Sequence, residues 1–504
     1  MNYIKNKYLL LLVLLLLTLL SVTGCGNDRK TSNQIVIGEH ADLGGYDPAS
    51  TMSPFVRSLV FNSLVELDAD FKLVPALAES WQMSADGKEW VFKLRDNVKF
   101  HDGTPLTAEV VKQNFQRLKT APAAKVWLLD LQDISVVNKN TVKFVMVRPA
   151  FTFAADIAVP IMSIVAPAAL DEKGVATKAI GTGPFALASW NKGQEFVMTA
   201  NQSYWGGAPK VDKLVFKVIT DPESRAMALE SGAVDFISLR QSLTAAGRLA
   251  KNNNIKLDKR LGQTSEIMFF NLQSPALQNL AVRKAVAQAI NIESMIKNLL
   301  GDNAEPGKQF FSPAYGDFVL PNAVNPPYNQ AQARQLLEQV GATNINLKLV
   351  YGAKNAEDSL LVGAIQADLQ AVGIGTTLVP LEDAALMKAF KEKNFDLIML
   401  GQSFIPHNEP ASHYRRGYYH PQSTYPVLTM PELTAQIEQL YNTGGAAQRN
   451  ALHQAIQRQI SEQMAVIVLF HRNNMVAGKK NIEGYQLSVG TWQIYRGLDK
   501  AYVK

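Results

Sequence analysis

The chain has 504 residues, of which 47% are hydrophobic and 19% are charged, a composition typical of globular proteins that fold in water. It excludes an intrinsically disordered chain and a polytopic membrane protein. The formal net charge of +6 is small for this length, and the lysines and arginines are scattered along the chain, which argues against a nucleic-acid-binding protein.

The amino terminus has the pattern of an export signal. Two lysines, Lys5 and Lys7, precede a nearly unbroken apolar run over residues 8–20. This order is typical of the n-region and h-region of a secretory signal peptide. The run is shorter than the roughly 20 residues that cross a bilayer as a helix, so the pattern favours a cleaved signal over a permanent anchor.

The only cysteine of the chain, Cys25, follows this run in the sequence LSVTGC. This segment resembles a bacterial lipobox, in which the cysteine becomes the lipidated amino terminus of the mature protein. A single cysteine cannot form an internal disulfide, and lipidation accounts for its position. We therefore expect residues 1–25 to be a lipoprotein signal peptide and residues 26–33 to be a flexible tether. The mature protein would be exported and lipid-anchored to the cell membrane, on its periplasmic or outer-surface side.

The first half of the mature chain combines short strands with few helices. Residues 89–95 alternate polar and apolar side chains with period two, which predicts a strand with one buried face. Thr107 precedes apolar residues at helical spacing and is expected to cap a helix, and Asp221 is expected to cap another that ends at Gly232. Further predictions are a helix over residues 55–67 and strands over residues 35–37, 141–147, 195–199, 213–219 and 234–237.

From about residue 262 the pattern changes to longer helices separated by single strands. Such an alternation is typical of an α/β lobe. The change in pattern predicts a boundary between two structural units at this point. Helices are expected over residues 281–290, 329–340, 359–372 and 384–391, and strands over residues 345–350 and 395–400.

Many short segments carry a family resemblance. They include PALAESW (residues 75–81), FKLRDNVKFHDGTPLTA (92–108), GTGPF (181–185), NQSYWGGAP (201–209) and IQADLQAVGI (365–374). The set resembles the peptide, opine and nickel family (family 5) of extracytoplasmic solute-binding proteins that serve ABC importers, and the resemblance extends from about residue 34 to the carboxyl end. The glycines Gly87, Gly103 and Gly183 are interpreted as turn positions with positive φ, not as ligand cradles.

The resemblance implies an α/β, two-lobed periplasmic-binding-protein-like fold with an extra subdomain in lobe one. Lobe one would comprise residues 34–262 plus 478–504, and lobe two residues 263–477. The lobes would close over a ligand, which lets an importer distinguish loaded from empty protein.

The same resemblance implies a monomeric binding protein whose partners are ABC permease subunits and a small-molecule substrate, without a cofactor. An enzyme is not expected, because the sequence contains no nucleophile elbow and no HExxH motif.

Residues 395–421 contain the side chains best suited to ligand binding. The strand predicted over residues 395–400 ends in a loop, where α/β lobes place binding residues. Imidazole suits nickel, and arginine holds carboxylates through two hydrogen bonds, so together they could hold a metal wrapped in a carboxylate-bearing chelator. The candidate metal ligands are His407, His413 and His420, and the candidate ligand contacts beside them are Tyr414, Arg415 and Arg416.

The scaffold is closer to the nickel-binding branch of this family than to the oligopeptide branch. Trp127 falls where that branch carries a cleft tryptophan, and its ring could stack on a chelate, although a packing role in the core is an equal alternative. Tyr46, which follows the first strand, is a further candidate ligand contact. The expected transported ligand is nickel, as a chelate with a small organic metallophore or histidine.

Two departures from that branch leave a peptide ligand open. Residues 158–162 are wholly apolar where nickel-branch members often carry an arginine, although Arg148 or the Arg415–Arg416 pair could substitute for it. Peptide-branch members usually carry an aspartate near Glu409, which could pair with the ammonium group of a peptide. The alternative function is a dipeptide- or oligopeptide-binding protein of an ABC importer.

Overall fold

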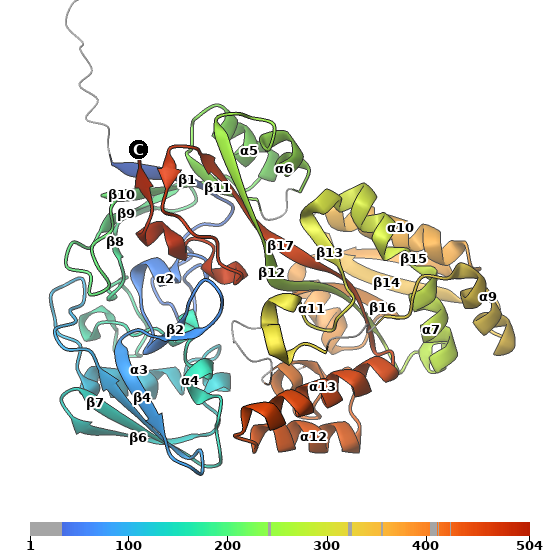
Figure 1. Cartoon of the computed structure of the whole chain (residues 1–504), viewed down its shortest axis with the longest axis horizontal. Coiled ribbons are helices and arrows are strands. Elements are labelled where there is room, and N and C mark those ends of the chain that lie inside the picture. Colours follow the sequence, from blue (N-terminus) through green and yellow to red (C-terminus); the bar gives the residue numbers. More distant parts are fainter. Residues whose placement is uncertain are drawn as a thin grey trace, which may run out of the picture.

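The computed structural model describes residues 33–239, 243–320, 325–353, 356–403, 411, 413–423 and 425–504. Figure 1 shows two lobes joined by two long strands. These strands, β12 (Ile255–Phe270) and β17 (Val466–Lys479), pair in antiparallel orientation. None of the helices in the described ranges is long and apolar enough to cross a membrane.

The main sheet has eleven strands and runs through both lobes. Besides β12 and β17, the first lobe supplies β1 (Gln34–Glu39), β8 (Phe185–Asn191), β9 (Glu195–Ala200), β10 (Lys213–Val218) and β11 (Phe236–Ser238). The second lobe supplies β13 (Ala304–Pro306), β14 (Asn346–Gly352), β15 (Gly375–Leu381) and β16 (Leu397–Ser403). The order is β15-β14-β16-β12-β17-β11-β1-β10-β9-β8, and β13 pairs with β17.

The two crossing strands change partners between the lobes. In the first lobe β17 pairs with β11, whereas in the second lobe β12 pairs with β16. The β12–β17 register shifts between Leu261 and Ser265, which marks a bulge midway along the pair. Because a bulge bends a strand and increases its twist, the sheet is most easily bent at this point.

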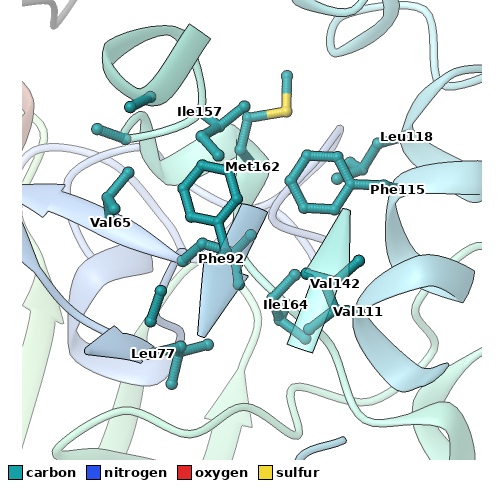
Figure 2. Packing of buried hydrophobic residues seen from close by; sticks show 14 of the residues in the cluster. Val65, Leu77, Phe92, Val111, Phe115, Leu118, Val142, Ile157, Met162 and Ile164 are labelled. Carbon is teal, nitrogen blue, oxygen red and sulfur yellow. The ribbon is translucent and has the colours of Figure 1, made fainter. Parts of the chain in front are cut away.

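A second, four-stranded sheet forms a subdomain of the first lobe. Its strands are β4 (Ala78–Met83), β5 (Glu89–Leu94), β6 (Leu131–Asn138) and β7 (Thr141–Met146), in the order β4-β5-β7-β6. Helix α3 (Ala108–Leu118) packs on it, and Figure 2 shows its Val111, Phe115 and Leu118 side chains turned toward Phe92 and Val142 of the sheet. The predicted strand over residues 89–95 and the predicted Thr107 cap are both confirmed, since the Val110 N–H donates to Thr107 Oγ1 (3.3 Å).

The remaining elements of the first lobe are short. The carboxyl-terminal segment returns to this lobe, where the Val489 N–H donates to the Ala69 carbonyl (3.0 Å). The elements are α2 (Arg57–Val60), β2 (Val65–Leu67), β3 (Leu73–Pro75), α4 (Phe153–Asp156), α5 (Pro222–Glu230), α6 (Leu243–Leu249), β18 (Ile482–Glu483) and β19 (Tyr502–Val503).

The second lobe has the alternating α/β pattern that the sequence predicts. Strands β14, β15 and β16 pair in parallel, and helices separate them along the chain. The helices are α7 (Leu280–Ala289), α8 (Ile292–Met295), α9 (Gln330–Gln339), α10 (Ala356–Gln370), α11 (Asp383–Lys391), α12 (Pro431–Tyr441) and α13 (Ala446–Glu462).

The predicted helix over residues 55–67 is wrong for most of its length. Only Arg57–Val60 is helical, and Val65–Leu67 forms a strand. Residues 59–67 are all buried. A segment enclosed on every side has no polar face, so its apolar spacing cannot distinguish a helix from an extended chain.

Glycine is required at Gly87, Gly103 and Gly183 for two different structural reasons. Gly87 (φ 69°) and Gly103 (φ 84°) have positive φ, as predicted. The prediction is wrong for Gly183, whose φ is not positive. A Cβ atom there would lie 2.5 Å from the Val60 carbonyl carbon and 2.6 Å from the Leu59 carbonyl oxygen. Close backbone approach, not turn conformation, therefore requires glycine at this position.

Asparagine substitutions should separate these two reasons. Gly103→Asn should lower the free energy of unfolding less than Gly103→Ala, which costs about 1–2 kcal/mol, because asparagine tolerates positive φ. Gly183→Asn should cost more than Gly183→Ala, at about 1–3 kcal/mol, because the larger side chain meets the same backbone. Urea unfolding of residues 26–504 measures all four variants. If the same one of the two substitutions, alanine or asparagine, lowered the free energy of unfolding more at both positions, this account would be contradicted.

Candidate functional site

The candidate ligand segment follows strand β16 in the second lobe. It contains a short π-helix over His413–Tyr418. His407 and Glu409 lie outside the described residues, as does Cys25, and the Arg416 side chain is also outside them. The structure therefore places four of the predicted site residues of this segment: His413, Tyr414, Arg415 and His420.

His413 and Tyr414 lie in the aromatic core of the second lobe. The His413 ring packs against Phe311 (5.5 Å between centroids) and Tyr418 (5.1 Å), and burial lowers its pKa well below the usual value. The Tyr414 side chain is fully buried, with its hydroxyl 3.4 Å from His453 Nδ1. In this conformation both side chains are enclosed by protein, and burial favours the neutral form of His413.

His420 and Arg415 instead converge on one carboxylate of helix α12. Glu438 Oε1 lies 3.1 Å from His420 Nε2 and 3.2 Å from Arg415 Nε. The Gln422 N–H donates to His420 Nδ1 (3.2 Å), so the neutral ring carries its proton on Nε2 and donates it to Glu438. Both nitrogens of His420 are thus engaged, and a metal would have to displace one partner.

Two residues of the first lobe complete this group. Asp130, directly before β6, accepts from Arg148 Nε (2.7 Å) and Nη2 (3.1 Å). Arg148 Nη1 donates to Glu438 (3.4 Å), and Arg415 Nη1 lies 3.8 Å from Asp130. We call the five residues Asp130, Arg148, Arg415, His420 and Glu438 the clasp cluster. It pairs two carboxylates with two guanidinium groups across the gap between the lobes.

Phe151 makes an apolar contact beside the clasp cluster. A Cβ atom on Gly87 of the first lobe would lie 2.9 Å from its ring, and one on Gly444, which follows α12, would lie 2.6 Å from it. The ring is therefore seated between backbone segments of the two lobes. Ion pairs and a close apolar contact therefore both connect the two lobes here.

The other predicted contacts in the first lobe lie in different places. Trp127 is half-buried in a 3-10 turn, packs on the subdomain core, and lies three residues before Asp130 of the clasp cluster. Tyr46 packs edge-on against Trp190 of the outer strand β8, at 5.4 Å between centroids. Trp127 is thus close to Asp130 along the chain, whereas the contact of Tyr46 lies at the edge strand β8 of the main sheet.

A second buried charge group lies beside the bulge in the crossing strands. Arg472 of β17 donates to Glu266 of β12 (2.9 Å) and to Glu357 (2.6 Å), and Asp358 lies 3.8 Å away. Burial, opposed by Arg472 and reinforced by Asp358 and Glu357, raises the pKa of Glu266 to about 7. One arginine therefore holds three carboxylates at the bend of the sheet.

Sequence reasoning missed Asp130, Glu438 and the group around Arg472. The carboxylates pair with residues that are not their neighbours in the sequence. Arg148, whose Nη1 donates to Glu438, precedes it by 290 positions. Local spacing carries no signal for such pairs. In the described ranges no group of three or more His, Cys, Asp or Glu side chains is arranged to hold a metal ion.

Removing the charge of Glu438 should weaken closure. Glu438→Gln keeps the side-chain size but loses the ion pairs to Arg148 and Arg415, so the ligand-free protein should spend more time open. Small-angle scattering of residues 26–504 should then give a larger radius of gyration. Glu432→Gln, at an exposed site on the same helix, is the matched control and should change nothing. Equal radii for Glu438→Gln and the unsubstituted chain would show that the cluster does not hold the lobes together.

The chain is similar to proteins of two ligand classes. It is 27% identical over 456 residues to the nickel-binding periplasmic protein of Escherichia coli (strain K12), covering 85% of this chain and 86% of the relative. It is 26% identical over 486 residues to the probable D,D-dipeptide-binding periplasmic protein DdpA of the same strain, covering 92% and 93%.

Solved structures share the fold across almost the whole chain. NikA from Brucella suis with Fe(III)-EDTA (24% identity, TM-score 0.86) and NikA from Staphylococcus aureus with Ni(L-His)2 (19%, 0.79) each match 94% of this chain over their full length. DppA from Helicobacter pylori with the peptide STSA (22%, 0.80) matches 94% of this chain and 99% of its own. The expected two-lobed periplasmic-binding-protein fold is thereby confirmed.

The family itself is identified by a family model. The model of bacterial extracellular solute-binding proteins, family 5, matches residues 72–424, which is more than half of the chain. Members of this family bind solutes for ABC transporters and are not enzymes, as the sequence analysis expected. The chain belongs to the family 5 bacterial extracellular solute-binding proteins.

Proposed function

We propose that this solute-binding protein captures nickel, as a chelate with histidine or another small organic metallophore, and delivers it to an ABC permease. The observation that carries the proposal is the position of an imidazole and two guanidinium groups at the gap between the lobes, in His420, Arg415 and Arg148. The similarity to the nickel-binding periplasmic protein of Escherichia coli and to NikA from Brucella suis with bound Fe(III)-EDTA supports the same choice.

In the proposed mechanism the ligand competes for groups that now pair with each other. A chelator carboxylate would take the place of Glu438 on Arg415, which suits the paired donors of a guanidinium group. Release of Glu438 would expose Nε2 of His420. The ring proton would have to move from Nε2 to Nδ1, with loss of the Gln422 N–H bond, before Nε2 could bind the metal. His407 is a second candidate ligand. The burial of His413 favours a packing role for it. Trp127 would then stack on the chelate from the first lobe.

The proposal also includes the division of the chain and its anchor. Residues 34–262 plus 478–504 would move as lobe one and residues 263–477 as lobe two, with the hinge at the bulge of β12. Residues 1–25 would be a signal peptide and Cys25 the lipidation site. A monomer carried on this anchor would deliver its ligand to permease subunits in the same membrane.

A peptide ligand is the second candidate, supported by the D,D-dipeptide and peptide-bound relatives. In this case Glu409 would pair with the peptide ammonium, as the sequence suggests, and Arg415 or Arg416 would hold the carboxylate. The histidines would then be bystanders.

Calorimetric titration of residues 26–504 should separate the two candidates. We expect saturable heat with nickel in the presence of free L-histidine, and at least tenfold weaker binding for His420→Ala combined with His407→Ala. Unfolding curves of the variant control for its fold. Heat only with a mixed dipeptide pool, lost in Glu409→Gln, would overturn the nickel proposal in favour of the peptide candidate. Heat from neither ligand would contradict both.

A further inference from the structure

The first described residues join the first lobe at a lysine-rich end. Asn33 Nδ2 donates to the Lys210 carbonyl (2.6 Å), and Gln34 pairs with Lys213 in the β1–β10 ladder. Both lysines are exposed. The chain therefore enters the folded body beside Lys210 and Lys213.

The carboxyl-terminal strands lie at the same end, where Figure 1 places the C-terminus beside β1 and β10. Lys210 Nζ lies 4.7 Å from the centre of the Tyr502 ring, and the Tyr502 hydroxyl donates to Glu483 (2.8 Å). The Lys504 N–H donates to the Asn481 carbonyl (2.9 Å). The lysine-rich end therefore extends from Asn33 to the paired strands β18 and β19.

A surface pocket of about 340 Å³ opens beside this pair of strands. Lysine and carboxylate side chains both line it, from the starts of β12 and β18 and the end of β17. The charged residues around it are Lys256, Asp258, Lys479, Lys480 and Glu483. We call Lys210, Lys213, Lys256, Lys479, Lys480 and Lys504 the tether-end surface.

Half of these lysines are neutralised and half are not. Asp258 pairs with Lys256 (3.0 Å), Asp235 with Lys479 (2.6 Å), and Glu483 with Lys504. Among the described residues no carboxylate lies within ion-pair distance of the three others, which are Lys210, Lys213 and Lys480. Exposed positive charge that no carboxylate neutralises remains available to an external anion.

The distance to the membrane is limited by the chain itself. Asn33 lies eight positions after Cys25, and eight residue steps of fully extended chain span at most about 28 Å. An anchored protein would hold Asn33, and with it the Lys210 and Lys213 edge of the tether-end surface, within about this distance of the lipid headgroups. Charged leaflets attract lysines within about 8 Å at physiological ionic strength, and tethering makes even weak attraction effective.

We propose that the tether-end surface binds anionic phospholipid headgroups of the membrane that carries the anchor. This inference rests on the proposed lipidation of Cys25. A phosphodiester would lie against Lys480 and Lys256, and headgroup hydroxyls would lie against Asp258 and Glu483, the chemistry of phosphatidylglycerol. Binding holds the first lobe against the bilayer and leaves the second lobe free to open and close.

Chemical tethering tests this surface without depending on lipidation in the cell. Residues 25–504 contain one cysteine, so maleimide lipids in vesicles couple the protein at Cys25. The coupled protein is compared on vesicles of phosphatidylcholine with and without 30% phosphatidylglycerol. Its lysines are acetylated to less than one acetyl group per molecule, and the modified positions are identified by mass spectrometry. We expect acetylation of Lys210, Lys213 and Lys480 to slow at least fivefold on the anionic vesicles and to recover in high salt. Exposed Lys119, Lys139 and Lys173 should change less than twofold.

Charge variants supply the matched control. Lys256 and Lys504 belong to the same surface and should also be acetylated more slowly on the anionic vesicles. Lys210→Gln with Lys213→Gln and Lys480→Gln should abolish this protection. Lys119→Gln with Lys139→Gln and Lys173→Gln should leave that protection intact. Equal acetylation on both vesicle types, or equal protection of all lysines, would overturn the proposal. The proposed ligand and anchor are tested apart from it, by titration of both variants and by the intact mass of the membrane-extracted protein.

Discussion

The pairing of β12 with β17 is the constraint on which the rest of the structure depends. The two strands pair from Ile255 opposite Lys479 to Phe269 opposite Val466, and their register shifts between Leu261 and Ser265 and again between Glu266 and Ile267. Each strand contributes to both lobes, so the lobes can move only by bending this pair. Continuous backbone hydrogen bonding resists sliding, which leaves rotation about the bulge as the permitted motion.

Charge is concentrated at the two places where that motion acts. At the bend, Arg472 holds Glu266 together with Glu357 near the start of α10, so a helix of the second lobe is attached directly to the hinge. Away from the bend, Glu438 of α12 forms an ion pair with Arg148 of the first lobe. A ligand that competes for the clasp cluster would change the balance between open and closed forms by the difference in its affinity for them. On the proposed function, a few named side chains would therefore link binding to a change of shape.

The sequence predicted the elements whose signals are local. Thr107 caps α3 and Asp221 caps α5, where the Ser224 N–H donates to the Asp221 carboxylate (2.7 Å). The alternating helices and strands after residue 262 were also correctly predicted. These signals depend on neighbours within a few positions of the chain, and the same physics acts on them in the folded protein.

The sequence could not predict features that depend on distant contacts. Residues 59–67 are buried on every side, and Gly183 is needed because the backbone of Val60 lies against it. His413 and His420 have the same chemistry and lie seven positions apart. One packs among Phe311 and Tyr418, and the other reaches Glu438 at the gap between the lobes. Only the packing around a histidine decides whether it is part of the core or part of a site.

The central claim is that ligand binding closes the two lobes about the bulge in β12. The most direct measurement is single-molecule energy transfer in residues 26–504, which contain no cysteine, with dyes attached at Lys139→Cys in the first lobe and Glu338→Cys in the second. Nickel with free L-histidine, or the dipeptide pool if that is what binds, should move the population to one higher-transfer state. An unchanged distribution at a concentration that saturates the binding heat would contradict the account.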